Sequence, residues 1–148
     1  MKKYIIAILS MTLFSLNILS QQVYIAKNGN INFISETSIE NISAKNNQVV
    51  SFLKTKKGEI NFGVLIKSFK FKNALMEEHF NENYMESDKF PKAKLNGHIT
   101  NIKDINFGKE GIYSGIIEGK LNIHGISHEI NAKAQIEVLD KNIATSST

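Results

Sequence analysis

The chain contains no cysteine and no arginine, and it has a single proline. Without cysteine it forms no disulfide, so packing must supply its stability even in an oxidising compartment. Without arginine it has no bidentate guanidinium contact to phosphate or guanine, and its lysines are scattered along the sequence. A solvated surface explains this charge better than a nucleic-acid-binding face, so we expect no nucleic-acid partner.

The first 20 residues have the layout of a secretory signal peptide. A basic start at Met1–Lys3 precedes the apolar run Tyr4–Leu19, and the small residue Ser20 follows. The run is short and polar for a membrane span, although a retained N-terminal anchor is the alternative. No later segment is apolar enough to cross a membrane. We therefore expect a signal peptide at 1–20, one domain at 21–148, and a periplasmic or secreted protein.

Most of the remaining chain shows the two-residue alternation of antiparallel strands. The alternation is clearest in Glu59–Lys67 and Ile130–Val138. Asn28–Asn30 predicts a turn between two short strands, and Ile39–Asn47 is polar and irregular. Strands of this kind, joined by short turns and each with one apolar face, predict an all-β sheet rolled into a barrel or folded as a sandwich.

One helix is expected among these strands, over residues 73–85. Asn73 can cap it, and Met76, Phe80 and Tyr84 share one face by their four-residue spacing. Pro91 prevents the helix from continuing. A single helical insert in an all-β chain packs on the strands or caps an opening between them, and we expect it to cap a cavity.

Glycines fall on the inward face of the strand expected at Tyr113–Ile123. Gly115 and Gly119 alternate there with large apolar residues. A glycine that faces inward leaves room, and that room can serve a neighbouring strand or a ligand.

Two motifs resemble the signatures of the YceI-like family. The helix with Leu75, Phe80 and Tyr84, followed by Ser-Asp-Lys-Phe-Pro-Lys-Ala at 87–93, resembles the middle signature. Residues 119–130, Gly-Lys-Leu-Asn-Ile-His-Gly-Ile-Ser-His-Glu-Ile, resemble the second signature, a Gly-x-Leu-Thr-Leu-His-Gly-Val strand and turn in which asparagine here replaces threonine. The stretch Met-Glu-Glu-His-Phe-Asn-Glu-Asn-Tyr is similar to the secreted Bacteroidetes branch.

The resemblance covers most of residues 23–147 and implies an antiparallel, lipocalin-like β-barrel with an elongated apolar tunnel. Characterised members of the family bind a polyisoprenoid chain, such as a quinone tail, in the periplasm. Members normally continue past the strand at 143–148 into two closing strands. The resemblance therefore implies a barrel that lacks its last strands, either because the chain is truncated or because a partner, such as a second copy in a homodimer, closes the edge.

The predicted ligand-binding residues are large apolar side chains on the inward faces and on the helix. An apolar tunnel lined in this way suits a long hydrocarbon. The alternative is that these residues fill a dry core and that the fold serves as a protein-interaction module. The predicted residues are Phe33, Phe52, Phe62, Val64, Ile66, Phe69, Leu75, Met76, Phe80, Leu95, Ile117 and Leu121.

Catalytic and metal-binding patterns are weak in this sequence. His124 and His128 are four residues apart, but Gly125 indicates a turn, and a locally hydrogen-bonded turn histidine explains His124 better than a metal ligand. Helical spacing places Glu78 and Glu82 on one outward face, as expected for solvated carboxylates. We find no motif of a hydrolase, phosphate loop or zinc protease. We therefore expect a binding protein rather than an enzyme, with no cofactor other than a bound isoprenoid or quinone-like lipid.

Overall fold

A single antiparallel sheet forms most of the computed structural model, which describes residues 22–36, 41–140 and 142–147. The predicted signal peptide lies outside the described residues. The strands follow the order β1-β2-β3-β5-β6-β7-β8, and β4 pairs with β2 off this path. The strands are β1 (Val23–Ser35), β2 (Ile42–Lys54), β3 (Glu59–Leu65), β4 (Lys70–Phe71), β5 (Lys92–Ile99), β6 (Gly111–Ile123), β7 (Ile126–Val138) and β8 (Ile143–Ser146).

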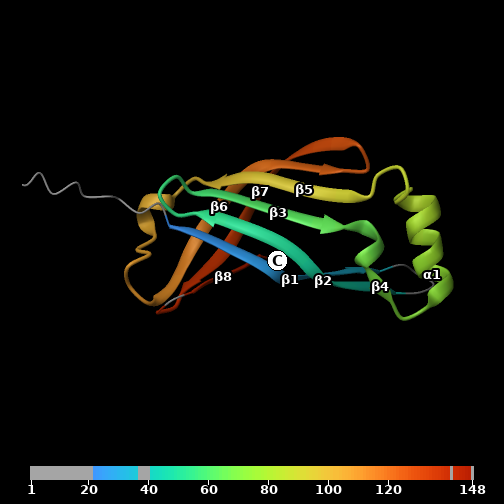
Figure 1. Cartoon of the computed structure of the whole chain (residues 1–148), viewed down its shortest axis with the longest axis horizontal. Coiled ribbons are helices and arrows are strands. Elements are labelled where there is room, and N and C mark those ends of the chain that lie inside the picture. The colour runs from blue at the N-terminus through green and yellow to red at the C-terminus, as the bar shows by residue number, and fades with distance from the viewer. Residues whose placement is uncertain (1–21, 37–40, 141, 148) are drawn as a thin grey trace, which may run out of the picture.

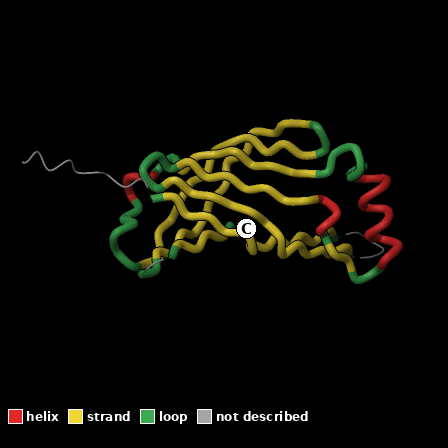
Figure 2. Tube along the Cα trace, viewed as in Figure 1, coloured by secondary structure: helices red, strands yellow, loops and turns green. Residues whose placement is uncertain are grey.

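The sheet coils into a nearly closed barrel with one short helical insert at one end (Figure 1). This confirms the predicted all-β, lipocalin-like barrel. The insert consists of α1 (Ala74–His79), which continues into the π-helical turn η2 (Phe80–Tyr84). Two 3-10 turns, η1 (Ile66–Ser68) and η3 (Ile102–Asp104), lie after β3 and β5. Figure 2 shows the insert at one end of the barrel and the η3 turn at the other. None of the described helices is long and apolar enough to span a membrane.

The predicted turn at Asn28–Asn30 is wrong, because β1 runs through it as one strand of 13 residues. Gly29 lies opposite Val49, and the register shifts on both sides of this pair. A Cβ on Gly29 would lie 3.2 Å from the Val49 Cβ, so glycine permits the close approach of β1 to β2. Residues on both sides of Asn28–Asn30 pair with β2, so this segment forms an irregularity in the β1–β2 pairing and not a turn. The stretch predicted as irregular likewise contributes residues 42–47 to β2.

A buried polar side chain marks the place where β2 changes partners. Strand β2 pairs with β3 through 50–54 and with β4 through 44–45. Asn46 lies between these two segments with 0% of its surface exposed. Its Nδ2 donates to the Leu65 carbonyl oxygen over 3.1 Å, and its Oδ1 accepts from the Gln48 amide over 2.9 Å. The Asn46 side chain thus forms hydrogen bonds with two backbone groups at the point where β2 changes its partner from β3 to β4.

Two apolar clusters lie in the barrel interior. The first is built around Ile60, Ile99 and Ile136, and the second around Val64, Ile66 and Phe69. Strands β3 and β7 bury the alternating faces that the sequence predicts, including Ala134, Ile136 and Val138 of β7. Phe62 packs against both clusters and so lies between them.

The helical insert begins as expected and then departs from the prediction. The Asn73 side chain accepts hydrogen bonds from the amides of Leu75 and Met76, which confirms it as the N-cap. Tyr84, however, is 72% exposed and does not share a buried face with Met76 and Phe80. The cause is the π-helical turn, in which the Met85 amide bonds to the Phe80 carbonyl and the four-residue spacing no longer aligns the side chains.

Glycines in β5 and β6 let these two strands approach closely. Gly97 and Gly119 are direct cross-strand partners. A Cβ on Gly119 would lie 2.3 Å from the Asn96 carbonyl oxygen and 2.5 Å from the Gly97 Cα. A Cβ on Gly115 would lie 2.7 Å from the Ile136 Cδ1. The sequence left open whether these inward glycines make room for a neighbouring strand or for a ligand. The space beside Gly119 is occupied by β5, and the space beside Gly115 is occupied by the Ile136 side chain.

Gly119→Ala should destabilise the fold by about 1–3 kcal/mol, because the added methyl group has no space between β5 and β6. Gly63→Ala is the matched control, since a Cβ there meets no atom within 4 Å. That control should be neutral or stabilise the fold by up to about 1 kcal/mol. Urea unfolding of the two variants measures both effects, and equal free energies of unfolding would contradict the close-approach argument.

Candidate functional site

Three of the predicted residues form a row across the inner face of the barrel, here called the inner row: Phe62, Leu95 and Leu121. Phe62 is the direct cross-strand partner of Leu95, and Leu95 is the partner of Leu121. All three share a face with buried neighbours on their own strands, and all three are only partly buried. The inner row is therefore an apolar strip inside the barrel whose side chains are not fully covered by the two clusters.

Four phenylalanine rings form an aromatic cluster at the helical end of the barrel. Phe33 contacts the rings of Phe69, Phe71 and Phe80 with centroid separations of 5.7–5.9 Å. Phe80 also lies 5.8 Å from Phe69 and 4.9 Å from Phe71. Three of these residues are in the predicted set. Phe71 is missing from it, although its two-residue spacing from Phe69 was a signal that could have placed it there.

The other predicted residues divide among three environments. Val64 and Ile66 are buried in the second cluster, and Ile117 is buried in the first. Met76 is partly buried on α1, whereas Leu75 is 58% exposed. Whether any of them contacts a ligand stays a prediction.

Phe52 lies on the opposite face of the sheet from the inner row. Its direct partner is Asn61, whereas the neighbouring Leu53 pairs with the buried Ile60. The Lys54 ammonium nitrogen lies 5.6 Å from the centre of the Phe52 ring. Phe52 is thus separated from the residues that the barrel brings together.

The two family motifs meet in space beside the β6–β7 turn. His124 Nε2 lies 2.8 Å from a carboxylate oxygen of Glu86, and the Phe90 ring centre lies 4.7 Å from the His124 ring. Glu86 and His124 are the two non-glycine residues of the described chain with positive φ, 41° and 51°. A Cβ on Gly125 would lie 2.6 Å from the Phe90 ring. The contact holds the segment after the insert against the β6–β7 turn.

The local partner predicted for His124 is therefore wrong. The histidine does lie in a turn, but its partner is 38 residues away in the sequence. No spacing within either motif could have indicated this contact, because it depends on how the barrel folds.

A carboxylate fixes the helical insert to β4. Glu77 accepts from the Lys70 ammonium over 2.7 Å and from the Phe71 amide over 3.3 Å. These hydrogen bonds, that from Lys70 foremost, lower the pKa of the Glu77 carboxyl from its ordinary value of 4.5. The Asn81 Nδ2 donates to the Glu77 carbonyl over 2.8 Å. Glu77 therefore connects α1 to the strand that carries Phe71.

Two hollows lie beside β4, with volumes of about 440 and 420 Å³. The larger is lined from β2, η1 and β4, and the smaller from β4, α1 and η2; Lys72, between β4 and α1, lines both. Neither is lined by any of the twelve predicted ligand-binding residues. The lysines of the larger hollow, at 45, 70 and 72, are among those that the sequence presented as scattered.

An antiparallel barrel with an apolar strip on its inner face and a helical insert at one end belongs to the class of small single-domain β-barrels that enclose side chains or a ligand. The chain belongs to the YceI-like family, since its residues 23–148 match the YceI-like domain. No curated protein matches the chain.

Solved structures with a related fold are distant in sequence. The fold is similar to a polyisoprenoid binding domain from Saccharophagus degradans, with a TM-score of 0.67, 12% sequence identity, and coverage of 80% of this chain and 68% of that one. A YceI protein of Campylobacter jejuni matches with a TM-score of 0.43 and 16% identity over 92% of this chain and 69% of that one.

Glu77→Gln should lower the free energy of unfolding by about 0.5–1 kcal/mol at pH 7, because it removes the charge that holds Lys70. Because the pKa of Glu77 is lowered in the folded state, its contribution is present above pH 4.5 and is lost as the pH falls through the lowered pKa. Unfolding curves of wild type and variant should therefore converge in acid. The control is Glu78→Gln, which changes the exposed neighbouring carboxylate. If the difference in free energy of unfolding between Glu77→Gln and wild type did not change with pH, the proposed role of Glu77 would be contradicted.

Proposed function

We propose that the protein binds a long isoprenoid or another amphiphilic lipid inside the barrel, as a periplasmic or secreted carrier or storage protein. The observation that carries the proposal is the inner row, in which Phe62, Leu95 and Leu121 are aligned across β3, β5 and β6 and stay partly uncovered. An apolar chain bound along this strip would cover the surface of the three side chains that the two clusters leave exposed.

The geometry of the inner row suits a hydrocarbon chain. Neighbouring strands lie about 4.8 Å apart, so three aligned side chains extend across about 10 Å. Each methylene group buried against such a strip contributes about 0.8 kcal/mol. The row offers no charged group to select a polar ligand. Affinity would therefore come from apolar area and from the length of the bound chain, with the polar head directed away from the row.

The family supports the same proposal. YceI-like proteins are binding proteins rather than enzymes, and they are generally periplasmic. The similar structure from S. degradans is described as a polyisoprenoid binding domain. Export by a signal peptide at 1–20 is consistent with this setting and belongs to the proposal.

The first test is native mass spectrometry with lipid extraction on the exported protein. We expect an isoprenoid or fatty lipid at close to one molecule per chain. A folded protein that stays empty when offered isoprenoid lipids would contradict the proposal and favour an interaction module with a filled core.

Phe62→Ala should weaken binding of the extracted lipid about tenfold, since it shortens the strip by one aromatic ring. Phe52→Ala is the matched control, because it removes the same side chain from the adjacent strand on the opposite face of the sheet. It should leave lipid binding unchanged. Lipid transfer assays on both variants make the comparison, and equal losses would contradict a ligand on the inner face.

Because Phe62 also packs against both clusters, its truncation can cost stability of about 3–5 kcal/mol. Leu121→Ala provides a second variant at a partly buried position beyond the clusters. It should weaken lipid binding while its urea midpoint stays close to that of wild type. Unchanged lipid binding in this folded variant would contradict the proposal.

A further inference from the structure

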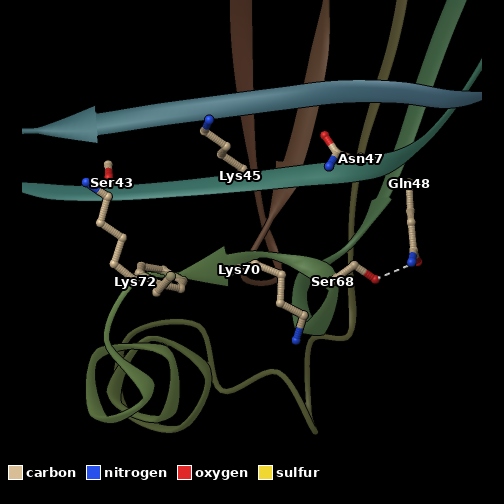
Figure 3. A pocket seen from close by; sticks show the side chains of 8 residues that line it. Ser43, Lys45, Asn47, Gln48, Ser68, Lys70 and Lys72 are labelled. Atoms are coloured by element: carbon tan, nitrogen blue, oxygen red, sulfur yellow. Dashed lines mark hydrogen bonds between the residues drawn. The ribbon is translucent and has the colours of Figure 1, made fainter.

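The larger hollow beside β4 is a basic groove on the outer face of the barrel (Figure 3). Ala44 and Asn46 of β2 are buried, so the residues that alternate with them face outward. Three lysines line the groove, together with four uncharged polar side chains and one phenylalanine. The basic groove is lined by Ser43, Lys45, Asn47, Gln48, Ser68, Lys70, Phe71 and Lys72.

The register of β2 and β4 brings like charges together in the groove. Lys45 and Lys70 are direct cross-strand partners, an arrangement that destabilises a sheet when nothing compensates it. Figure 3 shows their side chains directed apart, with Lys72 extended towards Ser43. Lys70 meets Glu77 at 2.7 Å. Among the described residues, Glu77 is the carboxylate that pairs with a lysine of the groove, so the lining carries two further ammonium groups, those of Lys45 and Lys72.

The described carboxylates near the groove, Glu77 and Glu78, lie on its helical side. Glu77 is held by Lys70 and by the Phe71 amide, and Glu78 lines the smaller hollow together with Lys72. Neither carboxylate lines the basic groove itself. The β2 side, where Lys45 lies, is lined by uncharged polar residues.

Uncharged donors supplement the lysines. Ser68 donates its hydroxyl hydrogen to the Gln48 Oε1 over 3.0 Å (Figure 3). Because Gln48 accepts through its oxygen, its NH₂ group keeps its donors for another acceptor. Asn47 and Ser43 add further side-chain donors along β2. The groove therefore offers several hydrogen-bond donors around its positive charge, and its volume of about 440 Å³ lies within the range of small-ligand sites, about 300–1,000 Å³.

We propose that the basic groove binds a phosphate monoester group. Such a group carries close to two negative charges at neutral pH and several strong acceptor oxygens, which match the ammonium groups of Lys45 and Lys72 and the donors of Gln48 and Asn47. Bound between the strands, it would offset the repulsion between Lys45 and Lys70. Lysine serves this purpose as a flexible point charge, in a chain that has no arginine.

The site is separate from the lipid site of the proposed function. The inner row lies on the inner face of β3, β5 and β6, whereas the groove lies on the outer face of β2 and β4. The two sites can therefore be tested independently. The phosphate monoester can belong to a soluble molecule or to the headgroup of a lipid such as phosphatidic acid, and the experiment distinguishes these sources.

Inorganic phosphate is the first probe, titrated into the full mature chain at constant ionic strength and followed by amide NMR. We expect saturable shifts confined to residues 43–48 and 68–72. The double variant Lys45→Gln/Lys72→Gln should weaken binding at least about tenfold. Its matched control is Lys103→Gln/Lys109→Gln, two exposed lysines outside the groove, which should bind phosphate as wild type does. Thermal unfolding should show both variants folded.

Vesicles supply the second arm, with phosphatidylcholine alone compared with phosphatidylcholine containing phosphatidic acid. Flotation with the phosphatidic acid vesicles that is lost in Lys45→Gln/Lys72→Gln would assign the groove to a lipid phosphate. Phosphate binding without flotation would assign it to a soluble phosphate monoester. Shifts that sodium chloride reproduces, or that persist unchanged in the folded double variant, would overturn the proposal.

Discussion

The architecture depends on the buried amide of Asn46, because it lies where the sheet divides. At this point β2 leaves β3 and takes β4 as its partner, and the Asn46 side chain bonds to Leu65 at the end of β3. A buried side-chain amide is tolerated only when its polar atoms form hydrogen bonds. Both the Nδ2 and the Oδ1 of Asn46 do so. The position of β4 follows from this division, and with it the positions of Phe71 and Lys70.

The helical insert is held from two directions that meet at the aromatic cluster. On one side Glu77 bonds to Lys70 and Phe71 of β4. On the other side Glu86 meets His124 at the β6–β7 turn. Between these two contacts, Phe80 of η2 contacts three of the aromatic rings from the strands or their connections. The insert is thus held at one end of the barrel by polar contacts at its margins and aromatic packing at its centre.

Local patterns predicted those parts of the structure that local interactions determine. Alternation identified β3 and β7, and the Asn73 cap followed from residue type and position. The turn expected near Gly29 does not form, because β1 pairs with β2 on both sides of this glycine. The glycine instead permits the close approach of the two strands. The π-helical turn after Phe80 likewise displaced Tyr84 from the expected face.

The candidate sites show the same division. Residues of the inner row were predicted because inward alternation on three strands selects them one strand at a time. The alignment of these residues into one row could not be predicted, because it depends on the register between β3, β5 and β6. The basic groove depends wholly on register, because Lys45 and Lys70 are 25 positions apart and become neighbours only through the β2–β4 pair.

The inner and outer surfaces of this barrel have different chemical characters, and the aromatic cluster lies between them. Phe71 packs in the aromatic cluster and also lines the basic groove, so one side chain contacts the interior and the charged exterior. Its backbone amide in turn bonds to Glu77, the residue that holds Lys70 away from Lys45. An anion that drew Lys70 towards Lys45 would compete with Glu77 for the same ammonium group. Occupation of the groove in this way would therefore weaken the Lys70–Glu77 ion pair between β4 and α1, while the hydrogen bond from the Phe71 amide to Glu77 would remain.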